Sequence, residues 1–460
     1  MYGGLAVTFI TVDPATGEER HRFALHDGSE VESRLQRAAV ASGTYGRTSF
    51  GERSRLMLGA AALLESELPA WAETMTAEMG KTFASAKGEV AKCVRAMRFF
   101  AEHAEAMLAD EPVPSSASQS RVVWEPLGVV LAVMPWNFPL WQVVRFAAPS
   151  IMAGNVVLLK HAPNVTETAL EIESLFRRAG YPDGVLQTLL VAVESVPAII
   201  EDPRVAAVTL TGSDAAGSSV ASTAGRCLKK AVLELGGSDP FVVMPSADLQ
   251  RAVAAAVEGR MQNNGQSCIA AKRFIVHSDV YEAFREGFTE AVSALVVGDP
   301  MDPATYIGPL ATAAGRDRLS AQVDDALSKG ATAECPPGPL ARPGFFYRPG
   351  VLSGVTRDMR VWQEEVFGPV AVLCRVGGVE EAIRVANDTP FGLGASVWTR
   401  DEAERDLLVG QIRAGMVFVN EMLSSTPEIP FGGIKRSGIG RELGSAGIRE
   451  LCALKTVWVA

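Results

Sequence analysis

The sequence predicts an α/β protein whose two parallel-sheet domains pack across a cleft. Short apolar runs such as GVVLAVM, NVVLLK and VAAVTLTG alternate with helical segments, the pattern of a parallel sheet covered on both faces. A second alternation begins near AVLELGGSDPFVVM and closes with GMVFVN, and at 460 residues the chain is too long for one hydrophobic core. We expect the ligand site at the carboxyl ends of the strands.

The elements follow in order along the chain. Residues 29–108 carry apolar side chains at three- and four-residue spacing, which predicts helices. The Pro/Ser-rich stretch 112–120 ends this helical part, and the first alternation of strands and helices follows. The apolar stretch 126–160 contains several prolines and Arg145, so it predicts buried strands joined to a helix rather than a membrane span.

The composition excludes several classes of function. A formal charge of −10 disfavours binding to nucleic acid or to a membrane surface. The six cysteines are scattered without a CxxC pair, and the N-terminus lacks a secretory signal, so we expect a reduced, cytoplasmic protein. The five histidines form no ligand cluster, and no metal is expected.

Cys268 lies in the stretch NNGQSCIAAKR, directly after a polar segment that contains a glycine. A lone cysteine is commonly a small buried apolar residue. Glycine and polar neighbours instead suit an exposed turn or a helix start, and a helix N-terminus would stabilise the thiolate that attacks carbonyl groups. The local sequence leaves both interpretations open.

Two further residues have both a structural and a catalytic interpretation. Glu234, in LELGGSDP, is either an edge-strand carboxylate facing water or a desolvated general base close to a ligand. Asn137, in VMPWNFPL, is either a turn residue or an amide donor to a developing oxyanion. A carboxylate that activates water is what the release of a thiol-bound acyl group requires.

Two segments could bind a nucleotide. VTLTGSDAAG, residues 208–217, runs from a strand through a glycine turn into a helix; it lacks the GxGxxG spacing, but a helix N-terminus of this kind suits a pyrophosphate. VVLLKHAP ends a strand on Lys160, which is either a solvated strand end or a contact to a ribose or phosphate.

Together these pieces resemble one family, the NAD(P)-dependent aldehyde dehydrogenases, along nearly the whole chain. The matching blocks, in the family's order, are PWNFP, LLK, TGS, ELGG, GQSC, EEVFGP, NDTPFGLGASVWT and PFGGIKRSGIGRELG. The chain is most similar to the short bacterial succinate-semialdehyde dehydrogenases.

The resemblance implies two Rossmann-like domains and a small β arm for oligomerisation. It assigns residues 1–111 and 126–232 to the cofactor-binding domain and residues 233–424 to the catalytic domain. The arm comprises residues 112–125 and 443–460, and residues 425–442 return the chain to the cofactor domain. A homodimer or homotetramer is therefore expected, because an exposed strand edge needs a partner.

The resemblance also implies a mechanism. Cys268 matches the nucleophile, which forms a thiohemiacetal and then, after hydride transfer to the nicotinamide, a thioester. Asn137 and the backbone N–H of Cys268 match the oxyanion donors. Glu234 matches the base that activates water, and Glu442 matches a carboxylate that helps to relay protons.

The cofactor is expected to be NAD or NADP. A glutamate of many NAD-preferring members is replaced here by Pro163, so a 2′-phosphate is not repelled, and His161 or Lys160 could attract it. The residues that match cofactor contacts of the family are Trp136, Lys160, Gly212, Ser213, Gly217, Leu235, Glu365 and Phe367.

Succinic semialdehyde is the favoured substrate. Arg145 matches one of two arginines that grip the substrate carboxylate in the family, although a surface or interface position is an equal alternative. The second arginine is replaced by Gln262, and Ser424 or Ser425 could supply a hydroxyl donor. Ala270 stands where some members carry a second cysteine, so no redox switch is expected.

Two other functions compete with hydrolytic oxidation. One is acyl transfer to coenzyme A, which Glu234 disfavours because members of that type generally lack this base. The other is a non-catalytic binding protein on the same fold, which the joint presence of Cys268, Asn137 and Glu234 disfavours.

Overall fold

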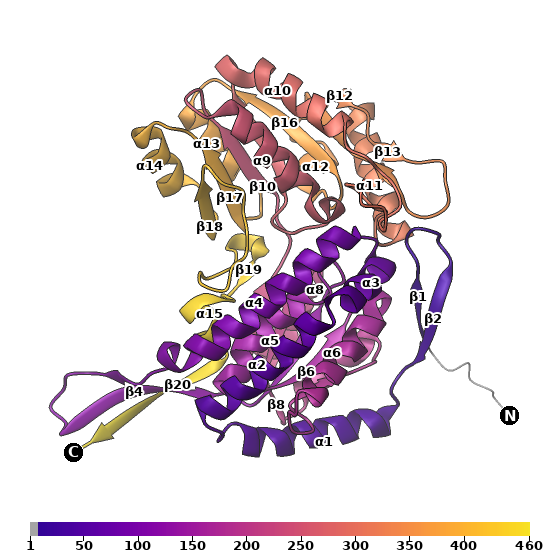
Figure 1. Ribbon diagram of the computed structural model, residues 1–460. Helices are drawn as coiled ribbons and strands as arrows, with labels where there is room; N and C mark the ends of the chain where they lie inside the picture. Colours follow the sequence, from indigo (N-terminus) through magenta and orange to yellow (C-terminus); the bar gives the residue numbers. More distant parts are fainter. Residues whose placement is uncertain (1–7) are drawn as a thin grey trace.

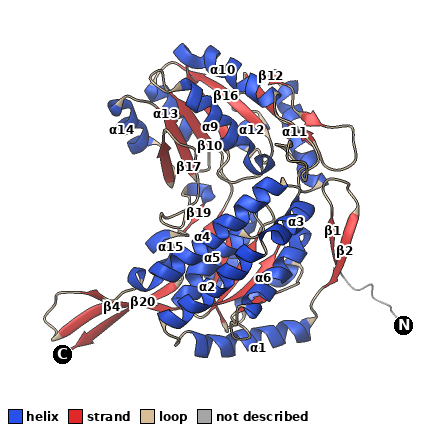
Figure 2. Cartoon of the chain, viewed as in Figure 1, coloured by secondary structure: helices blue, strands red, loops and turns tan. Residues whose placement is uncertain are grey.

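The computed structural model describes residues 8–460, which form two α/β lobes and a projecting arm (Figure 1). Helices cover the central sheet of each lobe, as the colouring by secondary structure makes clear (Figure 2). Most neighbouring strands of the two large sheets are parallel, so the predicted α/β fold class is confirmed. A hairpin of β1 (Thr8–Val12) and β2 (Glu19–Ala24) lies at the side of the first lobe.

The first lobe contains a six-stranded sheet with the order β19-β9-β8-β5-β6-β7. Only β19 runs antiparallel to its neighbour. The central strands are buried along nearly their whole length, because helices cover both faces, and they therefore read as continuous apolar runs. The strands are β5 (Val129–Met134), β6 (Val156–His161), β7 (Leu186–Thr188), β8 (Val205–Thr211), β9 (Lys230–Glu234) and β19 (Gly438–Ile439).

The predicted helical region 29–108 comprises four helices, which begin at capping side chains of Asp27, Ser49 and Thr82 or, for α3, at a proline. A buried carboxylate joins this region to the next: Glu89 accepts hydrogen bonds from the backbone N–H groups of Leu140 (2.9 Å) and Trp141 (2.8 Å), which begin α5. These four helices and the other helices of the first lobe are α1 (Gly28–Tyr45), α2 (Phe50–Ser66), α3 (Leu68–Met79), α4 (Phe83–Met107), α5 (Trp141–Ala153), α6 (Thr166–Arg178), α7 (Val196–Glu201) and α8 (Asp214–Arg226).

The second lobe contains a seven-stranded sheet with the order β12-β15-β16-β11-β10-β17-β18, in which only β12 is antiparallel to its neighbour. Its strands are β10 (Asp239–Val243), β11 (Ala271–His277), β12 (Thr332–Cys335), β15 (Gly350–Ser353), β16 (Val370–Val376), β17 (Gly394–Trp398) and β18 (Met416–Val419). Its helices are α9 (Leu249–Met261), α10 (Ser278–Ser293), α11 (Ala313–Ser328), α12 (Arg360–Gln363), α13 (Val379–Asn387) and α14 (Glu402–Gln411). A short hairpin joins β13 (Gly338–Pro339) to β14 (Tyr347–Arg348).

The arm is an antiparallel three-stranded sheet in which β4 (Gln119–Pro126) lies between β3 (Glu111–Pro112) and β20 (Cys452–Val459). Segments from opposite ends of the chain thus lie side by side, as the purple β4 and the yellow β20 show (Figure 1). The helix α15 (Gly444–Glu450), which precedes β20, packs against α5 of the first lobe.

The chain passes from the first sheet to the second between Glu234, the last residue of β9, and Asp239, the first residue of β10. It returns after β18, because β19 pairs again with β9 through Gly438 and Glu234. The site residues gather where these two crossings meet. The domain limits given by the sequence stay a prediction.

Among residues 8–460, no helix combines the length and the apolar character needed to cross a lipid bilayer.

Candidate active site

Cys268 lies in a turn between the short 3₁₀ helix η3 (Gln262–Gly265) and β11, and it is partly exposed. The turn is therefore not a helix start, the second setting that its sequence allowed. Two asparagines before it adopt left-handed backbone angles (φ 55° and 58°), which asparagine tolerates better than most residues. The side chain of the second, Asn264, donates to the carbonyl groups of Gly80 and Pro309, both at 2.9 Å, so contacts to two distant segments hold the loop.

Asn137 lies against the cysteine loop. Its Nδ2 donates to the carbonyl oxygen of Gln266 at 3.1 Å, two residues before Cys268. In return, Asn263 Nδ2 donates to the carbonyl oxygen of Asn137 at 2.6 Å. An amide group has two N–H donors, so the bond to Gln266 leaves one N–H of Asn137 without a partner in the described residues.

The thiol of Cys268 is protonated at neutral pH. Burial raises its pKa to about 11, and the negative charges of Glu365 and Glu234 act in the same direction, while Arg145 and Lys272 lower the pKa. Thiolate formation therefore requires a base and a positive environment. The ammonium group of Lys272 lies directly beneath the turn, where it donates to the carbonyl oxygens of Ser267 (3.0 Å) and Cys268 (2.6 Å).

Glu234 ends β9 with its carboxylate buried at 2% exposure. Neither carboxylate oxygen has a hydrogen-bond partner among residues 8–460. Burial and the nearby charge of Glu442 raise the pKa of Glu234 well above its ordinary value, and Arg145 and Arg441 oppose this only in part. Buried carboxyl groups without partners are rare in proteins and concentrate at functional sites.

Arg145 and Glu442 form a buried ion pair next to Glu234. The Arg145 side chain is 1% exposed, lies 4.5 Å from the centre of the Phe431 ring and donates to Thr211 Oγ1 at 3.3 Å. Burial raises the pKa of Glu442, and Arg145 opposes the rise. Arg145 is thus an interior residue rather than a surface residue, and its contact with a substrate carboxylate stays a prediction.

Lys160 lies near the end of β6 and Ser213 follows the end of β8, two strands of the first sheet that are separated by β5. Lys160 is 6% exposed and has no carboxylate within ion-pairing distance among residues 8–460; burial lowers its pKa. Ser213 caps α8 by accepting a hydrogen bond from the backbone N–H of Ala216 at 3.3 Å. An added Cβ at Gly217, in the first turn of α8, would lie 2.6 Å from the Leu235 side chain, which would then have to move. The backbone N–H of Gly212 donates to the carbonyl oxygen of Glu234 at 3.0 Å.

His161 does not supply a second positive charge beside Lys160. Burial lowers its pKa to about 4, and its Nε2 lies 2.8 Å from the carbonyl oxygen of Pro139. The imidazole is therefore neutral at physiological pH, and of the two cations that the sequence offered for a 2′-phosphate only Lys160 remains.

Glu365 and Phe367 approach the cysteine from the second lobe. Glu365 accepts from the backbone N–H of Gly237 at 3.1 Å and pairs with Lys272 Nζ at 3.2 Å. A Cβ at Gly236 would lie 2.5 Å from its carboxylate, so this close approach requires glycine. The Phe367 ring meets Trp136 edge-on at 5.7 Å. These groups fit a nicotinamide dinucleotide. Lys160 is a cation without a paired carboxylate, α8 presents its N-terminus, and Glu365 is a carboxylate that can bind ribose hydroxyls.

The remaining predicted residues are those expected to contact the substrate: Gln262, Ser424 and Ser425. Gln262 is partly exposed, and its side-chain amide is 3.5 Å from the carbonyl oxygen of Gly259. Ser424 is partly exposed, whereas Ser425 is buried and accepts hydrogen bonds from Lys92 and Trp141. Within the described part of the chain, no group of three or more His, Cys, Asp or Glu side chains could hold a metal ion.

Two lysines of this region carry no motif and were missed by sequence reasoning. Lys272 interrupts the apolar strand AKRFIVH, and a charged residue at a buried strand position is a usable signal. Lys92 lies inside a long helix with nothing around it to distinguish it from a surface lysine.

The lobes and the residues between them are those of a nicotinamide-dependent oxidoreductase, and the sequence comparisons identify which kind. The sequence profile described as "Aldehyde dehydrogenase family" matches residues 5–457. The chain belongs to the aldehyde dehydrogenase family and is an enzyme. The predicted family resemblance is thereby confirmed.

Several relatives and solved structures are similar to the chain over nearly its whole length. The chain is 56% identical to "Succinate-semialdehyde dehydrogenase [NADP(+)] 1" of Mycobacterium ulcerans, covering 98% of this chain and 99% of the relative. The protein of the same name from Mycobacterium tuberculosis (strain H37Rv) is 55% identical, with the same coverage. The crystal structure of succinic semialdehyde dehydrogenase from Streptococcus pyogenes in complex with NADP+ superposes with a TM-score of 0.96 at 35% identity, covering 98% of this chain and 99% of that one.

Proposed function

We propose that this enzyme oxidises succinic semialdehyde to succinate, with NADP as the preferred hydride acceptor. The names of the full-length relatives at more than half identity support the substrate and the cofactor. The observation that carries the chemistry is the meeting of the Cys268 turn, the Asn137 amide and the buried carboxylate of Glu234.

In the first step, the Cys268 sulfur attacks the aldehyde carbon and forms a thiohemiacetal. Because burial raises the pKa of the thiol to about 11, a base must remove the proton as attack occurs. The negative charge that develops on the aldehyde oxygen is stabilised by the free N–H of Asn137 Nδ2 and by the backbone N–H of Cys268. Asn137 is already oriented by its bond to Gln266, so little reorganisation is needed.

Lys160, Ser213 and Glu365 would hold the dinucleotide, which when bound supplies the hydride acceptor. Lys160 would contact the adenosine ribose, Ser213, which caps α8, would contact the pyrophosphate, and Glu365 would contact the nicotinamide ribose. The absence of a glutamate at Pro163 and the unneutralised Lys160 together favour a 2′-phosphate, and hence NADP over NAD.

In the second step, Glu234 removes a proton from the water that hydrolyses the thioester. Its carboxylate has no protein partner, so it is available to accept that proton. The Arg145–Glu442 pair lies beside it: Glu442 raises the pKa of Glu234, and Arg145 opposes the rise. A proton taken up by Glu234 can be passed on through Glu442 when product leaves.

The test is a steady-state comparison of the purified enzyme with NADP and NAD, without coenzyme A. We expect NADPH formation from succinic semialdehyde and a higher kcat/KM than for butanal, an uncharged aldehyde of equal length. Turnover that requires coenzyme A would contradict hydrolysis, and equal rates for the two aldehydes would contradict the proposed substrate.

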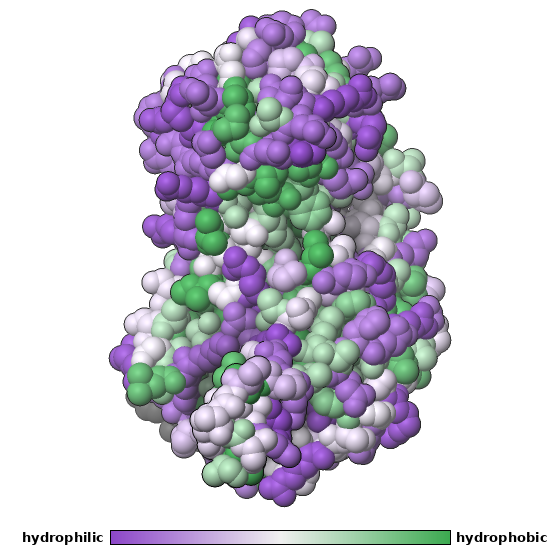
Figure 3. All heavy atoms as spheres, turned by 90° about the vertical axis from the view of Figure 1, so that its left-hand side faces the viewer, coloured by the Kyte–Doolittle hydropathy of each residue, from purple (hydrophilic) through white to green (hydrophobic). Residues whose placement is uncertain are grey.

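We also propose that the enzyme assembles as a homo-oligomer in a reducing compartment such as the cytoplasm. The arm exposes large apolar side chains, among them Leu454 (58%) and Trp458 (56%), that need cover in water. On the face in Figure 3, apolar residues also gather in a band between the two lobes. All six cysteines are free, which agrees with reducing conditions. The molar mass in solution tests the assembly; a monomer would contradict it.

A further inference from the structure

Lys92 approaches the substrate side of the site from the helix α4. Its ammonium group donates to Ser425 Oγ at 2.7 Å and lies 4.3 Å from the centre of the Trp141 ring. The three residues come from α4, from the start of α5 and from the segment after β18, so the fold brings them together over long sequence separations. Glu89, one turn before Lys92 on α4, caps the start of α5 and keeps Trp141 in register with it.

The hydroxyl group of Ser425 is left with an unused donor. Its oxygen accepts from Lys92 at 2.7 Å and from Trp141 Nε1 at 3.0 Å, and these two bonds occupy both lone pairs. The O–H of this buried serine has no acceptor among residues 8–460. Lys92 also has N–H donors beyond the one that Ser425 accepts. An acceptor with several lone pairs, such as a carboxylate, would satisfy both groups.

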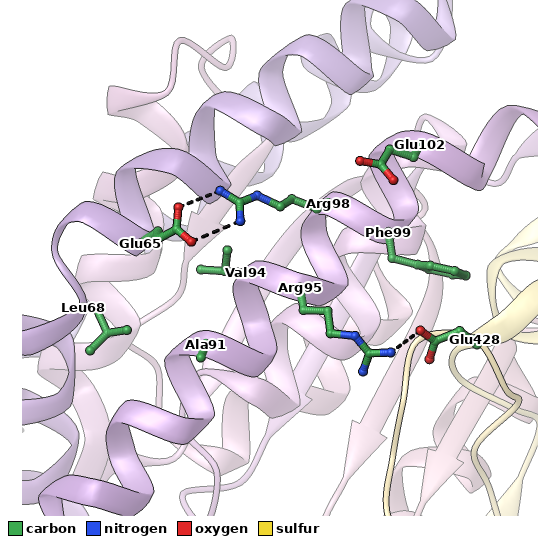
Figure 4. A pocket seen from close by; sticks show the side chains of 9 residues that line it. All are labelled: Glu65, Leu68, Ala91, Val94, Arg95, Arg98, Phe99, Glu102 and Glu428. Carbon is green, nitrogen blue, oxygen red and sulfur yellow. Dashed lines mark hydrogen bonds and ion pairs between the residues drawn. The ribbon is translucent and has the colours of Figure 1, made fainter.

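The neighbouring cations are already paired. Figure 4 shows Arg98 directed at Glu65 and Arg95 directed at Glu428, which belongs to the same segment as Ser425. Lys92, by contrast, has no carboxylate within ion-pairing distance in the described part of the chain. It is thus a partly buried cation whose charge no carboxylate of the described residues cancels.

Electrostatics connect Lys92 to the cysteine. Burial and then the positive charge of Arg145 lower the pKa of Lys92 to about 8, whereas Cys93, Glu89 and Cys268 oppose the change. Geometry gives the same connection: Trp141, over whose ring Lys92 lies, follows four residues after Asn137, which bonds to the loop of Cys268. An anion bound at Lys92 would stabilise the ammonium form, and the cost of partly burying this lysine would be offset by that ligand.

We propose that Lys92 and Ser425 bind the distal carboxylate of the aldehyde substrate while its carbonyl group reaches Cys268. Trp141 is a positioning residue, which holds the Ser425 oxygen so that the O–H points to the ligand. The inference rests on the proposed oxidation of an ω-carboxylated aldehyde, and its new element is Lys92, which it adds to the arginine and the serine hydroxyl that the family resemblance implies; the guanidinium of Arg145 is already ion-paired with Glu442.

The experiment compares kcat/KM for succinic semialdehyde and butanal in Lys92→Met, Lys92→Arg and Ser425→Ala. The matched control is Lys87→Met, an exposed lysine on the same helix. We expect Lys92→Met to lower kcat/KM for succinic semialdehyde about 10- to 100-fold, mainly through KM, and to change the value for butanal less than about twofold. Lys92→Arg should recover part of the loss, and Lys87→Met should change neither substrate.

A second readout does not depend on turnover. Succinate, the product, should raise the melting temperature of the wild-type enzyme and of Lys87→Met but not that of Lys92→Met. Equal losses for both aldehydes, or no loss in Lys92→Met, would overturn the assignment, as would succinate stabilisation that survives the substitution. A wild-type enzyme that oxidises neither aldehyde overturns the proposed function instead, and succinate binding then still decides whether Lys92 forms a carboxylate site.

Discussion

Arg145 on α5 and Lys92 on α4 place two positive charges near the same cysteine, and their partners give them different roles. Arg145 is 1% exposed and ion-paired with Glu442, so its charge is cancelled inside the first lobe. Lys92 is partly buried and bound only to neutral groups, a serine hydroxyl and an aromatic ring. The difference shows that a cation near an active site is more available to an anionic substrate when it is not ion-paired with a carboxylate of the protein.

The groups around Arg145 and the groups around Lys92 therefore suit different steps of the reaction. The side of Arg145 holds two raised-pKa carboxyl groups, Glu234 and Glu442, and suits proton transfer. The side of Lys92 offers unused donors and suits recognition of an anion. The four predictions that follow test this division, beginning with the atom that both sides share.

Replacing the sulfur should have the largest effect. Cys268→Ala is expected to lower kcat by at least about 10³-fold for charged and uncharged aldehydes alike, because no other group forms the covalent intermediate. Cys227→Ala, which changes a partly exposed cysteine on α8's C-terminal end, is the matched control and should keep full activity. A Cys268→Ala rate close to that of the wild type would remove the nucleophile assignment.

Replacing Glu234, the proposed base, should have the second largest effect. Glu234→Gln is expected to lower kcat about 10²- to 10⁴-fold and to leave a rapid burst of NADPH equal to the enzyme concentration, since the thioester forms but is not hydrolysed. In the wild type, the raised pKa of Glu234 means that the base form appears only as pH increases, so kcat should rise with pH above the ordinary titration range of a carboxyl group. The variant should lose this rise. Without a burst, or with the rise retained, Glu234 would not be the base.

The two cations should differ in their contribution to stability. Arg145→Met leaves the buried Glu442 without its partner, and we expect the free energy of unfolding to fall by about 3 kcal/mol. Arg145→Met combined with Glu442→Leu should recover much of that loss. Lys92→Met removes a cation without a carboxylate partner and should cost less than about 1 kcal/mol. Urea unfolding measures the free energy of unfolding of all three variants. Equal losses in Arg145→Met and Lys92→Met would contradict the different pairing of the two cations.

The smallest effect is expected at Lys160, a buried cation that likewise has no carboxylate within ion-pairing distance in the described residues. Lys160→Met should lower kcat/KM for NADP about 10-fold and for NAD less, because one charged hydrogen bond to a 2′-phosphate or ribose is lost. The preference for succinic semialdehyde over butanal should stay unchanged. If NADP and NAD were affected equally, the lysine would contact only groups that the two cofactors share.

The fold class followed from periodicity alone, because the buried parallel strands around β5 and β8 had to be continuous apolar runs. Helices were predicted within residues 29–108 from the apolar spacing, and three of the four that the structure shows begin at Asp27, Ser49 and Thr82, capping residues that can be read from sequence. For Cys268 the helix-start interpretation was wrong: the residue lies in a turn. Two left-handed asparagines before it, which no periodic pattern encodes, set that turn.

The sequence by itself determined the alternation of strands and helices, the family motifs around Cys268, Glu234 and Asn137, and the absence of a glutamate at Pro163. Only the tertiary structure decided which charges are cancelled. Arg145 meets Glu442 from near the other end of the chain, and Lys92 meets Ser425 across 333 residues. Burial and pairing are properties of contacts between distant segments, and the availability of a charge depends on both.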